Sequence, residues 1–317
     1  MDFSALYAVV ATLFLVMAVG FLCRRVGIID DTASKKLSAL ILKVGQPAMI
    51  ILALASPEYS DENLKIAGII TLLGFILHFF FAVFAYFSCK FIKNRDKGNI
   101  SEFGLIFTNC AFIGFPIFEA LFGPIGRFMG AFLVVSFNVL IWTLGITIFA
   151  RGRDDIKLTL KKALINFGTI PCVIGFALYM LKNPAIGFTM PAFVSTGFQY
   201  LTNLCTPISL LITGALIATQ KPKQIVASPT LYYFNLLKLF VLPLIVCLIT
   251  KLIGLSETYA LFATAAAALP AASSVAMMAE LYRLDSGYSS LIVGTSSLIS
   301  VLSMPLVLKI AQWLFAL

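Results

Sequence analysis

The chain has 317 residues, of which 60% are hydrophobic and 12% are charged, and its mean hydropathy is +1.00. Soluble globular domains carry about 25% charged residues, so the composition indicates a polytopic membrane protein with little chain left for a soluble domain. The formal charge of +9 does not indicate nucleic-acid binding, because the basic residues lie in short loops between apolar segments rather than on one solvated face.

Ten apolar segments follow one another along the chain. A helix needs about 20 predominantly apolar residues to cross a bilayer. The segments comprise residues 3–23, 37–55, 66–89, 103–122, 128–150, 163–181, 193–219, 231–250, 259–279 and 291–308. We therefore predict an all-α polytopic protein with ten transmembrane helices in the lipid bilayer of the cell membrane, the inner or plasma membrane.

The distribution of basic residues predicts the orientation of these helices. Short cytoplasmic loops are enriched in Lys and Arg. Of the 23 basic residues, 16 lie in alternate loops, starting with the loop after the first segment, and five lie in the other loops and the C-terminal end. Both termini are therefore predicted to lie on the extracellular or periplasmic side. We interpret the first segment as a retained helix, because Asp2 precedes it and Arg24 and Arg25 follow it, unlike in a secretory signal.

The positions of the prolines indicate an internal repeat. Pro47 and Pro207 are 160 residues apart, and Pro116 and Pro270 are 154 residues apart, both close to half the chain length. Residues 1–158 and 159–317 then form two halves with five predicted helices each. Because five is an odd number, the second half begins on the opposite side of the membrane, and we predict two inverted repeats.

Pro116 and Pro270 are predicted to interrupt the fourth and ninth helices. Proline removes a backbone donor and frees the carbonyl four residues earlier, which the membrane tolerates only inside protein or beside a wet cavity. Polar or small residues flank both breaks: Asn109, Cys110, Gly114, Ser273 and Ser274. Half-helix N-termini suit a carboxylate and freed carbonyls suit Na⁺, so the sequence predicts a substrate site where the two broken helices meet.

Several stretches, in this order and spacing, resemble the auxin efflux carrier family, which includes the plant PIN proteins, and the chain is similar to a bacterial member. They are residues 20–30 (GFLCRRVGIID) with Pro47; Asn109 with 114–116 (GFP); 206–210 (TPISL) and 214–218 (GALIA); 269–274 (LPAASS) and 280–283 (ELYR); and 296–300 (SSLIS) with 304–306 (MPL). The resemblance implies two inverted five-helix repeats with crossed helices four and nine, a fold shared with sodium/proton antiporters and bile-acid transporters. It also implies transport of an organic anion.

The same resemblance places the fourth-helix asparagine on Asn109 and the crossing prolines on Pro116 and Pro270. The ninth-helix position that is often asparagine in the family is Ser274 in this chain. A hydroxyl offers one donor where an amide offers two, so a particular relative's substrate does not carry over.

Four ionisable residues lie in the predicted spans, and three of them have two interpretations each. Lys43 and Lys238 either extend to the cytoplasmic surface or line the cavity, Lys43 near Gln46 and Pro47. His78 is either a proton carrier or a packed imidazole. Glu119 follows the first break and is a candidate coupling or gating carboxylate.

We therefore predict a secondary active transporter of a small organic acid, a mono- or dicarboxylate such as malate or malonate, that works by alternating access. The predicted substrate site consists of Lys43, Gln46, Pro47, Asn109, Cys110, Gly114, Pro116, Pro207, Lys238, Pro270, Ser273 and Ser274. A Na⁺ or H⁺ gradient supplies the energy, with His78 and Glu119 as coupling candidates. The alternatives are a cation/proton antiporter, and a membrane sensor of a metabolite or lipid that transports nothing.

Other classes of protein fit the sequence poorly. The six cysteines show neither a disulfide framework nor zinc-ligand spacing, and no nucleotide-binding or hydrolase motif occurs. We accordingly expect no enzyme activity, no metal site and no cofactor beyond the coupling ion. A homodimer is expected by analogy with relatives of this fold.

Overall fold

The computed structural model describes residues 3–153, 165–220, 223 and 228–316. Within these ranges every regular element is a helix, and one isolated β-bridge is present. Among the described residues, seven helices are long and apolar enough to cross a membrane, judged by length and composition. The prediction of an all-helical polytopic membrane protein is confirmed at this level.

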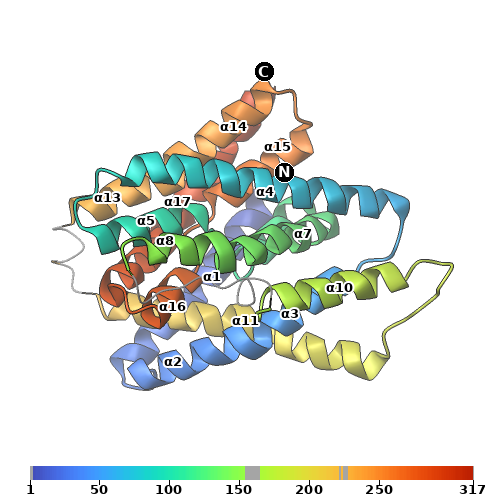
Figure 1. Cartoon of the computed structure of the whole chain (residues 1–317), viewed down its shortest axis with the longest axis horizontal. Helices are drawn as coiled ribbons and strands as arrows, with labels where there is room; N and C mark the ends of the chain where they lie inside the picture. The colour runs from blue at the N-terminus through green and yellow to red at the C-terminus, as the bar shows by residue number, and fades with distance from the viewer. Residues whose placement is uncertain (1–2, 154–164, 221–222, 224–227, 317) are drawn as a thin grey trace.

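The helix bounds follow the chain in two halves (Figure 1). In the first half they are α1 (Phe3–Arg25), α2 (Asp31–Leu40), η1 (Ile41–Gly45), α3 (Gln46–Ala55), α4 (Asp61–Cys89), α5 (Arg95–Ile106), α6 (Gly114–Phe122), α7 (Pro124–Leu140), η2 (Ile141–Gly145) and α8 (Ile146–Ala150). In the second half they are α10 (Thr169–Leu181), α11 (Ala192–Ala218), α13 (Pro229–Leu236), η3 (Leu237–Val241), α14 (Leu242–Leu252), α15 (Glu257–Ala268), α16 (Ser274–Leu281) and α17 (Ser286–Ala316). Each η segment is one π-helical turn inside a continuous helix: α2–η1–α3, α7–η2–α8 and α13–η3–α14.

Three of the ten predicted segments are not long helices. The fourth segment is divided into α5 and α6, with 12 and 9 residues, and the ninth into α15 and α16, with 12 and 8 residues. A 12-residue helix is only about 18 Å long, which is less than the roughly 30 Å hydrocarbon core. The sixth predicted segment contains α10, an apolar helix of 13 residues; residues 163–164 of that segment lie outside the described residues.

Polar side chains cap several helices where the apolar segments begin. The Asp30 carboxylate accepts a hydrogen bond from the backbone N–H of Ala33 at the start of α2. Ser60 caps α4 through the N–H of Asn63, and Asn94 caps α5 through the N–H of Lys97. Such caps satisfy N–H groups that have no partner inside the helix.

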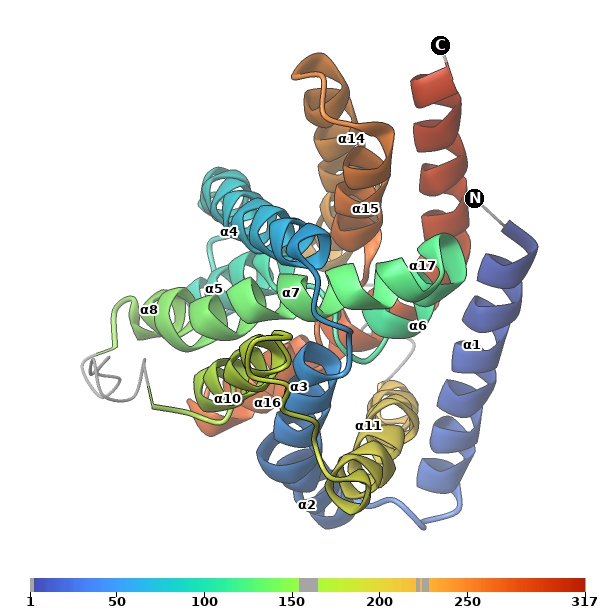
Figure 2. The same ribbon diagram turned by 90° about the vertical axis from the view of Figure 1, so that its right-hand side faces the viewer.

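The helices form two groups (Figure 2). The four-helix group comprises α1, α2–η1–α3, α10 and α11, which pack on one another. The crossing group comprises α4, α5, α6, α7–η2–α8, α13–η3–α14, α15, α16 and α17. Within the four-helix group, α1 and α11 approach closely because glycines face the opposing backbone: a Cβ on Gly214 would lie 1.9 Å from the Met17 carbonyl oxygen. Small residues permit this close packing of membrane helices.

Candidate substrate site at the crossing of two broken helices

The two interrupted helices are joined through their backbones. Thr108 and Ala271 form an antiparallel β-bridge. The N–H of Asn109 donates to the carbonyl of Pro270, and the N–H of Ala272 donates to the carbonyl of Phe107, both at 2.9 Å. Backbone groups that the breaks remove from helical hydrogen bonding are thus satisfied by the other half of the chain, as burial in an apolar medium requires.

The two prolines occupy different places relative to the breaks. Pro270 lies in the extended segment between α15 and α16, but Pro116 is the third residue of α6. At that position proline is tolerated, because the first N–H groups of a helix have no intrahelical acceptor. The break between α5 and α6 is instead held by Asn109: its side-chain oxygen accepts from the N–H of Phe112, and its carbonyl accepts from the N–H of Gly114. The expectation that Pro116 interrupts the fourth helix is corrected accordingly.

A buried polar cluster joins the crossing to the four-helix group. The Asn109 amide donates to Ser273 Oγ at 3.3 Å, and Ser273 Oγ also lies 3.3 Å from Ser209 Oγ and 3.4 Å from Thr213 Oγ1. Ser273 is the residue that precedes α16, whereas Ser209 and Thr213 belong to α11. All four side chains are buried. The neighbouring Ser274 hydroxyl is also buried and has no hydrogen-bond partner among the described residues.

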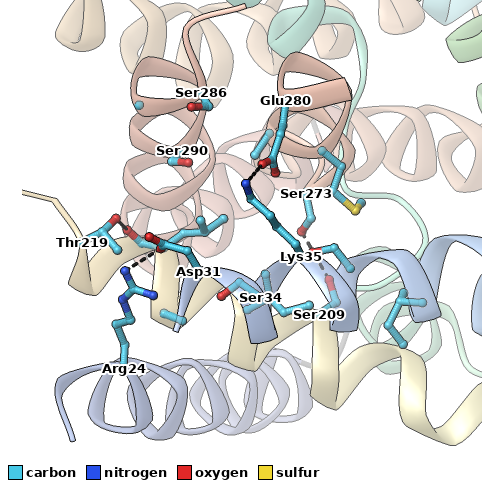
Figure 3. A pocket seen from close by; sticks show the side chains of 18 of the residues that line it. Arg24, Asp31, Ser34, Lys35, Ser209, Thr219, Ser273, Glu280, Ser286 and Ser290 are labelled. Atoms are coloured by element: carbon cyan, nitrogen blue, oxygen red, sulfur yellow. Dashed lines mark hydrogen bonds and ion pairs between the residues drawn. The ribbon is translucent and has the colours of Figure 1, made fainter. Parts of the chain in front are cut away.

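A cavity of about 370 Å³ leads to this cluster (Figure 3). We call it the Ser273 cavity. Its inner end is lined by Phe112, Ser209 and Ser273, and its mouth by the ends of α1, α2, α16 and α17. It therefore lies between the four-helix group and the crossing group.

Two ion pairs stand at the mouth of the Ser273 cavity (Figure 3). Arg24 and Asp31 are 2.6 Å apart, and both belong to the four-helix group. Lys35 of α2 and Glu280 of α16 are 2.7 Å apart, so this pair connects the two groups.

A second cavity, of about 460 Å³, lies at the other end of α2–η1–α3. We call it the Glu119 cavity. It is lined by Ser56 at the end of α3, by Phe115 and Glu119 of α6, and by Arg127 of α7. Glu119 is exposed and lies 3.5 Å from Arg127. Because Phe112 lines the Ser273 cavity and Phe115 the Glu119 cavity, the start of α6 separates the two.

Several predicted site residues lie elsewhere. Lys43 and Pro207 are exposed, and neither is among the residues that line the two cavities. Gln46 is buried, and its amide donates to the side-chain oxygen of Asn138 in α7. Cys110 is a buried free thiol beside the bridge. Gly114 is packed so tightly that a Cβ would lie 3.0 Å from the Phe118 ring.

The two buried basic residues also lie away from the cavities. Lys238 is 0% exposed, and its Nζ donates to the carbonyl of Leu105 at 2.9 Å. His78 Nδ1 donates to the carbonyl of Gly74 at 2.7 Å, and its Nε2 has no partner among the described residues.

Pro47, next to Gln46, is partly buried at the start of α3. In the described part of the chain, no group of three or more His, Cys, Asp or Glu is placed to hold a metal ion.

Sequence reasoning did not select Ser209 and Thr213. They are one helical turn apart and so lie on one face of α11. The signal was present in the stretch 206–210, in which Ser209 follows Pro207 by two residues. Selecting it requires knowing that α11 packs against the crossing, which neither hydropathy nor charge indicates.

Comparison with known proteins gives the family. The family profile described as "Membrane transport protein" matches residues 5–308, and the chain belongs to this family. The resemblance to the auxin efflux carrier family is thereby confirmed. The chain is a multi-pass protein of a membrane transport family rather than of an enzyme family.

Two relatives show that the similarity runs nearly end to end. The uncharacterized transporter MJ1031 of Methanocaldococcus jannaschii is 21% identical over 291 residues, which cover 87% of this chain and 89% of the relative. The uncharacterized transporter YfdV of Escherichia coli K12 is 21% identical over 311 residues, which cover 95% of this chain and 96% of the relative. Both are described as transporters without a stated substrate.

Proposed function

We propose that this protein is a secondary active transporter of a small organic anion, a mono- or dicarboxylate such as malate or malonate, and that it works by alternating access. The observation that carries the proposal is the position of Ser273. It lies at the inner end of a cavity, at the N-terminal end of α16, and bonds to Asn109 from the other half of the chain. Helix N-termini offer unpaired N–H groups and a positive dipole end, which favour an anion.

The arrangement of cavities supports alternating access. The Ser273 and Glu119 cavities adjoin opposite ends of α2–η1–α3, and both lie where the four-helix group meets the crossing group. A shift of the crossing group relative to the four-helix group would open one cavity as it closes the other. In this structure the crossing residue Ser273 is reached from the cavity whose mouth holds Arg24 and Lys35. By the positive-inside rule that mouth faces the cytoplasm.

The proposal includes ten membrane crossings in two inverted repeats, residues 1–158 and 159–317. Seven long helices, α10 and the two broken pairs α5–α6 and α15–α16 supply the ten. The grouping of helices favours the repeat, because the first two crossings of each half belong to the four-helix group. The start of α1 and the end of α17 lie on the same side of the molecule, as an even number of crossings requires (Figure 2). Under the positive-inside rule this side is the extracellular or periplasmic one.

Coupling to an ion gradient is part of the proposal, since the chain shows no nucleotide-binding motif. Of the two coupling candidates, Glu119 lines a cavity and is paired with Arg127. His78 is buried, and its Nε2, which has no partner in the described part of the chain, is the ring atom that would accept a proton. A homodimer stays a prediction.

A ligand screen followed by flux measurement tests the function. The protein, purified in detergent, is heated with malate, malonate and other carboxylates, with and without Na⁺ and at two pH values. A ligand that binds the folded state raises the melting temperature by mass action. The best ligand, radiolabelled, is then followed into proteoliposomes. Uptake supports the proposal; ion-stimulated pH dissipation without anion flux supports an antiporter, and binding without flux supports a sensor.

A matched pair of variants tests the site itself. Asn109→Ala removes the amide that bonds to Ser273, and we expect carboxylate affinity to fall about tenfold, the value of roughly one buried hydrogen bond. Asn203→Ala, which changes an exposed asparagine of α11, should leave affinity unchanged. Wild-type affinity in Asn109→Ala would remove this residue from the site.

A further inference from the structure

Lys238 is unusual for an ionisable residue because its side chain is completely buried. It lies in η3, its side chain is 0% exposed, and its Nζ donates to the carbonyl of Leu105. Leu105 is the penultimate residue of α5. The last four carbonyls of a helix lack an intrahelical partner and carry the negative end of the helix dipole. Lys238 therefore places its amine at the negative end of a broken helix, at the crossing.

Neither of the ordinary explanations for a membrane lysine applies to Lys238. It does not extend to the surface, because it is fully buried. Among the described residues no carboxylate forms an ion pair with it; the other groups around it are the Phe81 ring, 5.8 Å from Nζ, and the titratable His78 and Cys110. A lysine in the middle of a membrane span is costly to insert, and such residues mark functional positions.

The repeat gives Lys238 a counterpart. His78 precedes it by 160 residues, the same separation as that between Pro47 and Pro207. Each lies in the third helix of its half, α4 or α13–η3–α14, and each is buried. His78 Nδ1 lies within hydrogen-bond distance of the Gly74 carbonyl of its own helix and of Ser136 Oγ of α7, whereas Lys238 donates to a carbonyl of α5. The two halves therefore differ in what they place near the crossing, a histidine in the first half and a lysine in the second.

The crossing contains two helix N-termini, of α6 and α16, and two C-termini, of α5 and α15. Without a further charge, the partial positive charges of the two N-termini would offset the partial negative charges of the two C-termini, and the C-terminal carbonyls would attract a cation. Two carbonyls, those of Phe107 and Pro270, are already used in the bridge, and Lys238 takes that of Leu105. We propose that Lys238 sets the charge selectivity of the transporter: its ammonium group occupies the place a Na⁺ ion would take at the end of α5 and leaves the crossing electropositive, so that an anion binds there without Na⁺.

This inference rests on the proposed function and narrows it. Lys238 is not among the residues that line the Ser273 cavity, so it acts on the substrate through its field rather than by contact. It is a selectivity residue, and its effect must scale with the charge of the ligand. A unit charge about 10 Å away at an effective dielectric constant of about 20 changes affinity roughly tenfold per ligand charge.

The experiment compares malonate, with two negative charges, and its monoamide malonamate, with one, in wild type, Lys238→Met and Lys238→Arg. In Lys238→Met we expect affinity to fall about tenfold for malonamate and about 100-fold for malonate. Lys238→Arg should keep both within about threefold. Lys43→Met, which changes an exposed lysine of η1, is the matched control and should change neither.

A second measurement uses the wild-type protein alone. Replacing Na⁺ by K⁺ or choline at constant ionic strength, without any carboxylate, should leave its melting temperature unchanged. Specific stabilisation by Na⁺ would overturn the inference. Equal losses of affinity for both probes in Lys238→Met would also overturn it, because they would indicate a structural role, and so would wild-type affinities in that variant.

If Lys238→Met does not fold, the affinities of Lys238→Arg and the Na⁺ measurement still test the inference. If wild type neither binds nor moves any anion, the proposed function fails, and the Na⁺ measurement shows separately whether the cation place is filled.

Discussion

At the scale of single residues, two adjacent serines at the start of α16 have different partners. Ser273 Oγ lies within hydrogen-bond distance of Asn109, Ser209 and Thr213. The Ser274 hydroxyl is buried without a partner in the described chain. A buried polar group without a partner destabilises the folded protein, so we propose that the Ser274 hydroxyl, which has no partner among the described residues, binds the substrate.

Replacing Ser274 by Ala separates binding from stability. We expect the melting temperature to stay the same or rise slightly, because no hydrogen bond is lost, while carboxylate affinity falls about tenfold. Ser303→Ala is the matched control, since Ser303 is another buried hydroxyl without a described partner but lies in α17. Thermal shift with a malonate titration measures both quantities. Equal affinities in the two variants would exclude Ser274 as a ligand.

Lys43 and Lys238 show that the sequence does not predict whether a single side chain in a membrane span is buried or exposed. Lys43 and Lys238 both lie in predicted spans, and the two interpretations applied to each. In the structure Lys43 is exposed and Lys238 is 0% exposed. Their different environments depend on which face of each helix meets its neighbours, and that rotation is set by packing of the whole bundle.

At the scale of elements, the Lys35–Glu280 ion pair links the two groups of helices. It joins α2 of the four-helix group to α16 of the crossing group, whereas Arg24–Asp31 lies within one group. With side chains 63% and 44% exposed, the Lys35–Glu280 pair contributes little stability. Because it lies at the mouth of the Ser273 cavity, we propose that its separation is a step of alternating access.

Cross-linking tests this step. Cysteines at positions 35 and 280, joined by a short reducible bifunctional thiol reagent, should reduce malonate flux at least tenfold, and a reducing agent should restore it. Cysteines at positions 24 and 31, joined in the same way, should leave flux intact because both lie in the four-helix group. Undiminished flux in the cross-linked 35–280 protein would show that the two helices do not separate during transport.

The broken helices show how far proline predicts an element. Both breaks were predicted, and Pro270 lies in one of them. The other break spans Phe107 to Ile113, before Pro116, and is stabilised by Asn109. An Asx-type turn is a weaker sequence signal than a proline, so the sequence predicted the existence of this break but not its position.

At the scale of the whole molecule, we predict that the two cavities are accessible from opposite sides of the membrane. A cysteine at Ser38, which lines the Ser273 cavity, should react with a membrane-impermeant thiol reagent added from the cytoplasmic side of oriented vesicles. A cysteine at Asn63, which lines the Glu119 cavity, should react from the external side. The wild-type protein, with its native free cysteines, provides the background rate. Reaction from the reversed sides would invert the predicted topology.

Much of the architecture of the whole molecule could be predicted from the sequence. Hydropathy predicts a polytopic helical protein, and the motifs predict the family that the profile match confirms. The division into a four-helix group and a crossing group was not predicted, because it depends on contacts between helices distant in the chain, such as α1 with α11. Those contacts rest on glycines, Gly20 and Gly214 among them, which hydropathy does not distinguish from other small residues.

The single β-bridge at the crossing has a consequence for biosynthesis. In the described chain the N–H of Asn109 bonds to Pro270 and the carbonyl of Phe107 bonds to Ala272, and both partners are synthesised more than 150 residues later. Until then these two peptide groups of the nascent first half lack a hydrogen-bond partner, and the hydrocarbon core of the membrane cannot supply one. We therefore expect the N-terminal half to complete its folding only after the second half has been synthesised. Until then it is either bound by the insertion machinery or incompletely inserted.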